Sequence, residues 1–552
     1  MKSTKRLHAA FFINKLNRQA GVLAFLGGMA LYYGWRMFAL TPWYDELYTY
    51  YCFISKGPLY AAIHWPLPNN HVGYSVLSAF LDYLGNPYIG LRGISYLCAL
   101  ANICLLYKIA EKYKKGWMPL AVVILYVSMN LVNQLAVQGR GYTLGITCFL
   151  TAWLCMTAIC GEKKAGRKVY AVYALSLVLG LYAVSSNVYW VVPLCIAGGC
   201  CLLFKGIQES RERTCFVLKT ESGKKLVKLV AASVAAALGT VFLYGLIWLA
   251  IGSNLLVKDI SSAYYGMGHV KMILQAPFAA IGRGMEYMLD TPYIQSEERA
   301  GFFGRFWEWL QTLSGYFYPL SSLVMIIWGI GILFALYRIV KGIRAKAYKD
   351  MLLYLVLFWG IILVPVCLLI QCKRPYYRVF TYGGVFLAML LGVLADFVLT
   401  FLAQKSSGKK KDFSFVLFLG AVAVGVKCLG FSGYHTQYGV NEYEIQDAFS
   451  QGDMKNRQAI CVTDCNQEYL LYFLYGIRCE NREIEGADAV LLDKRMTDPD
   501  FTEMVWEFYH YYDTVPWDYI RQNMTKTYEN NNYILYTAEV SAGQTAAEPE
   551  NG

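Results

Sequence analysis

Charged residues are scarce in this chain. Asp, Glu, Lys and Arg make up only 16% of its 552 residues, hydrophobic residues make up 57%, and the mean hydropathy is +0.35. A soluble domain normally carries about 25% charged residues, which keep its surface in water. The shortage excludes a soluble enzyme and predicts a protein with many membrane-spanning helices.

Nucleotide-binding motifs are also missing. The sequence has no Walker A pattern and no Gly-x-Gly-x-x-Gly after a predicted strand. The basic loops between the apolar runs are too short to build a nucleotide-binding domain. These absences exclude a cytoplasmic nucleotide-dependent module.

The sixteen cysteines do not form a disulfide framework, because most of them lie in apolar runs, where Cys acts as a small hydrophobic residue. Only Cys461, Cys465 and Cys479 cluster near the C-terminus. They have no His at ligand spacing, which argues against a zinc site and leaves one disulfide as an alternative.

Apolar runs of membrane-spanning length recur along the chain. A hydrocarbon core of about 30 Å requires roughly 20 apolar helical residues. Runs of this length predict about eleven spans. The expected spans are 20–40, 91–110, 117–137, 141–160, 169–187, 188–205, 228–252, 318–340, 351–371, 379–402 and 413–431.

Lys and Arg are concentrated in alternate loops. The N-terminal tail and the loops at 108–115, 205–228 and 338–349 are basic, whereas the loops between them are not. Because basic loops stay in the cytoplasm, the pattern predicts a cytoplasmic N-terminus and an extracytoplasmic C-terminus in an integral, multi-pass protein of the cell membrane. The net charge of +12 is therefore a topology signal and implies no nucleic-acid partner.

This topology predicts a mainly α protein, a polytopic helical bundle with a small extracytoplasmic α/β domain. Within the last part of the chain, apolar runs shorten into expected strands near 458–464, 487–494 and 531–540, with helices at 465–477 and 501–524. The expected parts are a basic tail (1–19), a membrane domain (20–431) with long outer loops at 41–90 and 253–317, the α/β domain (432–540) and a disordered tail (541–552).

Polar side chains gather near the outer ends of the spans. Asn130, Gln134 and Gln138 follow one another at i, i+4 in an expected helix, which would place them on one face. The others are Arg36, Arg140, Asn187 and Tyr189 in the 185–190 hairpin, Lys373, Arg374 and Arg378. Taken singly, such amides often only bond a neighbouring helix, and such arginines often reach the headgroups. Their convergence predicts a shared, water-accessible cavity at the outer face.

Two adjacent acids, Asp45 and Glu46, follow the first span in the stretch TPWYDE. The same stretch also fits an ordinary helix start, with Thr41 as a cap, Pro42 in the first turn and both acids near the positive end of the helix dipole. This alternative stays open. Successive residues point about 100° apart around a helix, so the two acids are not expected to share one role.

The order of segments along the chain resembles the GT-C glycosyltransferases, the superfamily that includes protein O-mannosyltransferases and lipid A aminoarabinose transferases. After the acids, NNHVGYSVLSAFL, LRGISYLCAL, VQGRGYTLGITCFLTAWL, SSNVYWVVPLCI and RPYYRVFTYGGVFLAMLLG are each similar to a family segment, in the family's order. The resemblance covers roughly residues 20–400. One departure is that His71 is followed by Val72 and Gly73, where the family usually has two prolines.

The resemblance implies a polyprenyl-phosphate-linked sugar as donor. It implies transfer at the outer surface to a hydroxyl of an acceptor protein, lipid or cell-wall glycan. Transfer requires a base for the hydroxyl proton and positive charge for the leaving phosphate. Asp45 matches the family's catalytic acid, and Glu46 ranks second.

Expected phosphate ligands are Arg374, Arg378, Arg140 and Lys373, because guanidinium groups bind phosphate oxygens in pairs. His71, Asn187 and Tyr189 are expected to contact the acceptor or the sugar. Some relatives use a divalent metal, but the sequence offers no ligand set beyond the acid pair. We therefore expect that no cofactor is required, with a divalent metal as the alternative.

Three other functions fit parts of the sequence. A transporter or flippase of lipid-linked sugars would need a similar polar cavity, yet no paired repeats are evident. A receptor with 432–552 as its ligand-binding head is a second alternative. A ligase of lipid-linked oligosaccharide, whose donor carries a pyrophosphate, is the third.

Overall fold

The structure is a computed structural model. It describes residues 2–64, 70–161, 165–250, 267–280, 282, 299–348, 350–405, 414–431, 440–479, 483–501 and 512–538. The expected disordered tail at 541–552 lies outside these residues, as do residues 253–266, 281 and 283–298 of the expected outer loop.

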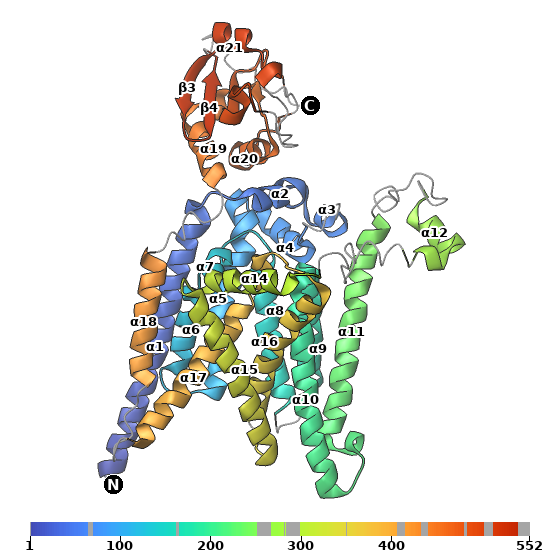
Figure 1. Ribbon diagram of the computed structural model, residues 1–552, viewed down its shortest axis with the longest axis vertical. Helices are drawn as coiled ribbons and strands as arrows, with labels where there is room; N and C mark the ends of the chain where they lie inside the picture. Colours follow the sequence, from blue (N-terminus) through green and yellow to red (C-terminus); the bar gives the residue numbers. More distant parts are fainter. Residues whose placement is uncertain are drawn as a thin grey trace.

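Long helices run side by side and form the body of the molecule (Figure 1). They are α1 (Lys2–Ala39), α5 (Pro87–Tyr113), α6 (Met118–Ser128), α8 (Tyr142–Ile159), α9 (Arg167–Ala183), α10 (Val188–Arg213), α11 (Glu221–Ala250), α15 (Ser321–Arg344), α16 (Met351–Gln371), α17 (Gly383–Lys405) and α18 (Ser414–Phe431). Within the described ranges, seven helices are long and apolar enough to cross a membrane. The helical membrane bundle is confirmed, whereas the count of about eleven spans is not.

The expected span at 117–137 is broken. Met129 has an extended backbone (φ −69°, ψ 133°) between α6 and the short helix α7 (Asn130–Leu135). In a continuous helix its N–H would donate to the Leu125 carbonyl, but that oxygen accepts from the hydroxyls of Ser128 (2.9 Å) and Tyr318 (2.7 Å) instead. Gln138 lies beyond the end of α7, so the prediction that it shares a helix face with Asn130 and Gln134 is wrong.

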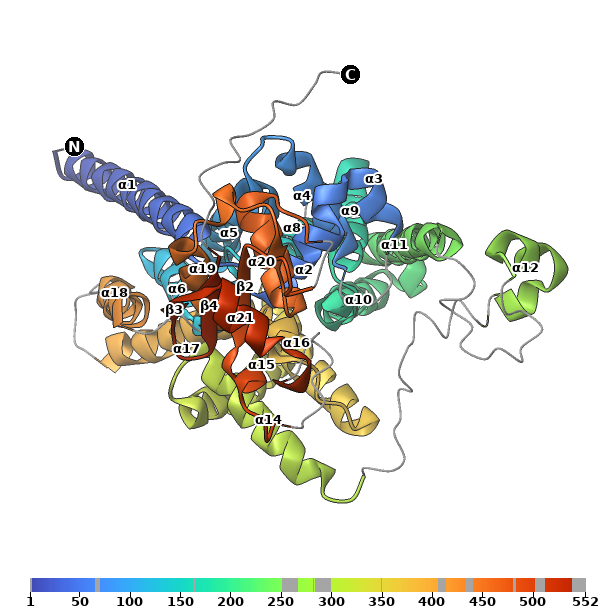
Figure 2. The same cartoon turned by 90° about the horizontal axis from the view of Figure 1, so that it is seen from above.

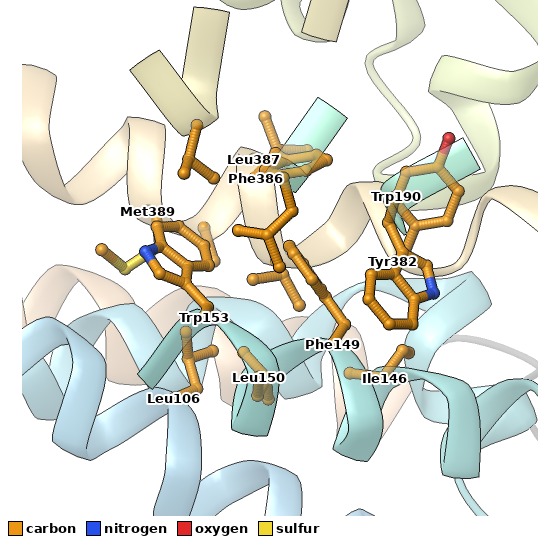
Figure 3. Packing of buried hydrophobic residues seen from close by; sticks show 14 of the residues in the cluster. Leu106, Ile146, Phe149, Leu150, Trp153, Trp190, Tyr382, Phe386, Leu387 and Met389 are labelled. Atoms are coloured by element: carbon orange, nitrogen blue, oxygen red, sulfur yellow. The ribbon is translucent and has the colours of Figure 1, made fainter. Parts of the chain in front are cut away.

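Aromatic rings fill the centre of the bundle, where α8, α10 and α17 meet (Figure 3). The Phe149 ring centre lies 5.2 Å from that of Trp190 and 5.3 Å from that of Phe386. Glycine lets α16 approach this cluster, because a Cβ added at Gly360 would lie 2.4 Å from Phe386 Cζ. The interior is close-packed and leaves no room there for an extra methyl group.

Further helices collect at the end of the bundle opposite the N-terminus (Figure 1). They are α2 (Tyr44–Cys52), α3 (Pro58–Ile63), α4 (Val72–Asp82) and α14 (Phe302–Phe317). α14 runs crosswise to the long helices and packs on α15, as an interfacial helix would. The short helix α12 (His269–Gln275) also belongs to the 253–317 segment, and residues 277–280 there are helical as well.

The C-terminal domain stands at the same end, over α2 (Figures 1 and 2). Its sheet has the order β1-β2-β4-β3, with β1 and β2 parallel and the other neighbours antiparallel. Its elements are α19 (Val440–Gln451), β1 (Ile460–Cys461), α20 (Cys465–Tyr475), β2 (Ala489–Asp493), α21 (Trp517–Asn523), β3 (Thr525–Glu529) and β4 (Tyr533–Thr537). The small α/β fold is confirmed. The structure forms no disulfide among Cys461, Cys465 and Cys479, so that alternative is not seen.

Replacement of Gly360 by Val tests the close approach of α16 to the aromatic cluster. Because the new side chain would overlap Phe386, we expect a loss of about 1–3 kcal/mol of stability, seen as a lower thermal midpoint in detergent. Gly420→Val in α18 is the control, since a Cβ there meets no atom within 4 Å. Equal midpoints for the two variants would contradict the packing.

Candidate active site

Helix α2 carries both acids of the TPWYDE stretch and has two unlike faces. Asp45 and Thr49, one turn apart, point toward the bundle and bond Arg140. Tyr44, Tyr48 and Tyr51 contact Tyr469 of the C-terminal domain. Helix α2 therefore lies between the membrane domain and the C-terminal domain and contacts both.

Asp45 faces two arginines that come from distant parts of the chain. Its Oδ2 lies 2.9 Å from Nη2 of Arg378 and 4.0 Å from Nη2 of Arg140. Arg140 also donates from Nη1 to the Asp45 carbonyl (3.3 Å) and to Thr49 Oγ1 (2.5 Å). The side chain of Arg140 is 2% exposed, whereas Asp45 and Arg378 are 13% and 22% exposed. Solvent reaches this cluster from the side of Asp45 and Arg378.

Arg378 is held by aromatic groups. It lies in the 3-10 turn η5 (Tyr377–Phe380), just before α17. Its guanidinium carbon lies 5.1 Å from the ring centre of Trp43 and 4.7 Å from that of Tyr376, and its Nε donates to Tyr142 Oη at 3.2 Å. Cation–π contacts of this kind orient a guanidinium group without neutralising it.

The cluster of Asp45, Arg140 and Arg378 carries one excess positive charge, because two guanidinium groups face one carboxylate. A guanidinium group stays charged at all physiological pH values and binds carboxylate or phosphate oxygens in pairs. The arrangement can therefore accept an anion beside Asp45.

His71 lies behind Arg140, at the start of α4. Its Nδ1 accepts from the Gly141 N–H at 2.9 Å, and its Nε2 lies 3.3 Å from Nη2 of Arg140. Burial, helped by the charges of Arg140 and Arg378, lowers the pKa of His71 well below its ordinary value. The imidazole is thus neutral near pH 7 and adds no further positive charge.

Glu46 lies about 100° further around α2 than Asp45, and it is fully engaged by other partners. Arg92 of α5 binds it with both nitrogens, Nε to Oε1 at 2.8 Å and Nη2 to Oε2 at 2.9 Å. The Gly139 N–H donates to Oε1 at 2.5 Å, and the Trp43 N–H donates to Oε2 at 3.3 Å. The two acids have separate partners, as their angular spacing on the helix suggested.

Lys373 and Arg374, the other expected phosphate ligands, precede η5 in a non-helical turn. Arg374 and Arg378 therefore do not share a helix face, despite their spacing. Arg374 is exposed, and across the described ranges Asp45 forms ion pairs with Arg140 and Arg378 but not with Lys373 or Arg374.

Asn187 lies in the 3-10 turn between α9 and α10, and Tyr189 lies in the first turn of α10. Asn187 donates from Nδ2 to the Gly180 carbonyl at 2.7 Å, so it closes this hairpin. Tyr189 stacks on Phe380, with ring centres 5.6 Å apart. Tyr189 is thereby close to the η5 turn of Arg378. Sugar or acceptor binding by these residues and His71 stays a prediction.

Three residues of the site were not expected from the sequence. Thr49 and Tyr142 bond the arginines, and Arg92 binds Glu46. The sequence did hint at a role for Arg92, because a lone Arg inside an apolar run usually has a charged or polar partner. No sequence feature pointed to Thr49 or Tyr142, since such residues are common at helix ends.

The acids of this site do not form a metal-binding set. Glu46 is engaged by Arg92, and Asp45 faces two cations. Within the described part of the chain, no group of three or more His, Cys, Asp or Glu side chains is arranged to hold a metal ion.

Comparisons with known proteins give a remote likeness. No protein-family model and no curated protein matches the chain. The archaeal oligosaccharyltransferase AglB from Archaeoglobus fulgidus, in complex with an inhibitory peptide and a dolichol-phosphate, is 10% identical, with a TM-score of 0.43 over 87% of this chain and 70% of that chain. A structure of the Archaeoglobus fulgidus oligosaccharyltransferase with Zn and sulfate is 11% identical, with a TM-score of 0.46 over 82% of this chain and 61% of that chain.

The chain spans less than two thirds of the length of the second structure. With about a tenth of the residues identical, the similarity assigns neither a substrate nor a catalytic residue to this chain.

Removal of either partner of the Glu46–Arg92 pair tests its structural role. Both side chains are almost fully buried, so Glu46→Ala is expected to cost about 3–5 kcal/mol by leaving Arg92 uncompensated. The double variant Glu46→Leu, Arg92→Met should recover part of this loss. Thermal unfolding in detergent measures both.

The exposed pair Arg521–Asp518 supplies the control, because Asp518→Ala should leave the midpoint almost unchanged. A Glu46→Ala midpoint equal to that of Asp518→Ala would show that the buried pair contributes nothing.

Proposed function

We propose that the chain is an integral-membrane glycosyltransferase that moves a sugar from a polyprenyl-phosphate donor to an acceptor hydroxyl on the extracytoplasmic side. The observation that carries the proposal is Asp45 between Arg140 and Arg378, in a partly exposed cluster with one excess positive charge. This pairing of a base with a phosphate-binding site is what the transfer requires.

In the proposed reaction, the acceptor oxygen attacks the anomeric carbon of the sugar. Asp45 takes the hydroxyl proton as the new C–O bond forms and the bond from the anomeric carbon to the phosphate oxygen breaks. The electron pair of that bond leaves with the polyprenyl phosphate. Arg378 and Arg140 stabilise the charge that develops on this phosphate.

An apolar cavity next to Arg378 supports a lipid-linked donor. It has a volume of about 350 Å³, and its lining comes from α14, α15, α16 and the segment at the start of α17. Phe380, two residues after Arg378, is part of this lining, together with Phe317 and Trp328. A phosphate at Arg378 would thus leave an isoprenoid tail beside an apolar surface.

The placement of the parts supports the proposed sidedness. The N-terminus and the cluster around Asp45 lie at opposite ends of the bundle, and the C-terminal domain lies at the end with Asp45 (Figure 1). With the basic loops in the cytoplasm, the cluster opens outward. An acceptor protein, lipid or cell-wall glycan would approach there.

We assign the remaining polar residues by their contacts. Glu46 fixes α2 through Arg92, Thr49 accepts from Arg140, and His71 accepts from the Gly141 N–H next to Arg140. Tyr189 remains the candidate for contact with the sugar, because it lies beside Phe380 at the cavity.

Asp45→Asn keeps the size of the side chain and removes the base. We expect its kcat to fall by about 10²- to 10⁴-fold with the donor KM little changed. The assay measures transfer of radiolabelled sugar from a polyprenyl-phosphate donor by the purified full-length protein. Activity close to wild type would remove Asp45 from the mechanism. A pyrophosphate-linked oligosaccharide, tested in parallel, identifies a ligase if only that donor is used.

Arg378→Ala should raise the donor KM at least about tenfold, because a charge-assisted contact with the phosphate is lost. Arg374→Ala is the matched control, four residues away and without an ion pair to Asp45. The affinity for a sugar-free polyprenyl phosphate gives a second measurement. If both variants bind this lipid like wild type, the phosphate does not lie at Arg378.

A further inference from the structure

The helix that carries Asp45 is capped by a residue of another domain. The first N–H groups of any helix lack partners within the helix and need acceptors from outside. In α2, the Trp43 N–H donates to Glu46 of the same helix, whereas the Tyr44 N–H donates to Oε1 of Glu442 at 2.9 Å. Glu442 lies 398 residues further along the chain, in the first turn of α19.

Glu442 is fixed in its place by the C-terminal domain. Its side chain is buried, and Asn466 of α20 donates to the same Oε1 at 3.2 Å. One turn further along α19, Gln446 is hydrogen-bonded to Thr41, which precedes α2. The domain therefore defines both the start of α2 and the chain leading into it.

The same domain also holds the far end and the outer face of α2. The Tyr51 hydroxyl donates to Glu468 of α20 at 2.8 Å. Tyr51 packs on Tyr469, with ring centres 4.7 Å apart, and Tyr44 and Tyr48 meet the same ring at 6.1 and 6.0 Å. Contacts along the whole length of α2 leave it little freedom to rotate or slide relative to the arginines.

We propose that Glu442 is a positioning residue for the reaction, and that the C-terminal domain completes the active site by capping the helix of Asp45. A carboxylate at this helix end both accepts the N–H and complements the positive end of the helix dipole. Asp45 is the residue directly after the capped Tyr44. The orientation of its carboxylate toward Arg378 and Arg140 thus depends on Glu442. The effect of Glu442 on catalysis rests on the proposed function, whereas its capping of α2 does not.

The test compares Glu442→Ala, Glu442→Gln and Glu444→Ala in the full-length protein. Hydrogen exchange of the amides of residues 44–52 reports the position of α2 without any substrate. Loss of the cap should speed exchange there about 5- to 30-fold in Glu442→Ala. Glu442→Gln should exchange like wild type, because its amide oxygen can still accept from Tyr44 and Asn466.

Glu444→Ala is the matched control on the same helix. Glu444 accepts from the side chain of Asn531 and the backbone N–H of Asn532, within its own domain, and among the described residues it has no hydrogen bond or ion pair to α2. Its loss should leave exchange of 44–52 unchanged. An unchanged exchange rate in Glu442→Ala, or an equally fast rate in Glu442→Gln, would overturn the capping role.

Transfer kinetics give the second measurement. We expect kcat of Glu442→Ala to fall about 10- to 100-fold with the donor KM unchanged, because the base is displaced and the phosphate site is kept. Glu442→Gln should restore most of kcat. An unchanged kcat, despite faster exchange, would overturn the catalytic part of the proposal. If wild type itself transfers no sugar but the exchange pattern holds, the proposed function fails and the cap stands.

Discussion

The site depends on the clamping of one nine-residue helix between two different surfaces. On the inner side, α2 meets Arg140, Arg378 and the buried Arg92. On the outer side, it meets tyrosines and carboxylates of the C-terminal domain. A helix of this length is marginal by itself in water, so its position has to come from these tertiary contacts.

The two acids at the start of α2 differ in burial and in partners. Glu46 has four hydrogen bonds and almost no exposure, which suits a residue that fixes the fold. Asp45 remains partly exposed, with one near arginine and one more distant arginine. Adjacent positions in the sequence thus differ in burial because a helix turns about 100° per residue.

The sequence allowed some parts of this arrangement to be predicted. The length and spacing of apolar runs indicated the long helices, and alternation of short apolar segments indicated β1, β2 and β4. β3 was missed because the stretch TKTYE has no apolar run and lies at the exposed edge of the sheet. The break at Met129 was missed because it depends on the hydroxyl of Tyr318, far away in the sequence.

The residues that bind the two acids could likewise be predicted only in part from the sequence. Arg140 and Arg378 stood out because charges are rare in a membrane domain. Arg374, four residues before Arg378, could not be set apart from it by sequence, because residues 373–376 turn out not to be helical. Glu442 could not be singled out among the many acids of the C-terminal domain. Its importance comes from a contact across 398 residues, which no local pattern encodes.

That long separation in sequence also affects the order in which the site is assembled during synthesis. The segment with Asp45 leaves the ribosome early, whereas α19 is made only after the last long helix, α18, has been completed. Until then the Tyr44 N–H at the start of α2 lacks its acceptor, Glu442. A nascent chain already inserted in the bilayer would hold every inner-face partner of Asp45 and still lack the cap of α2, which forms only after α19 and α20 have been made.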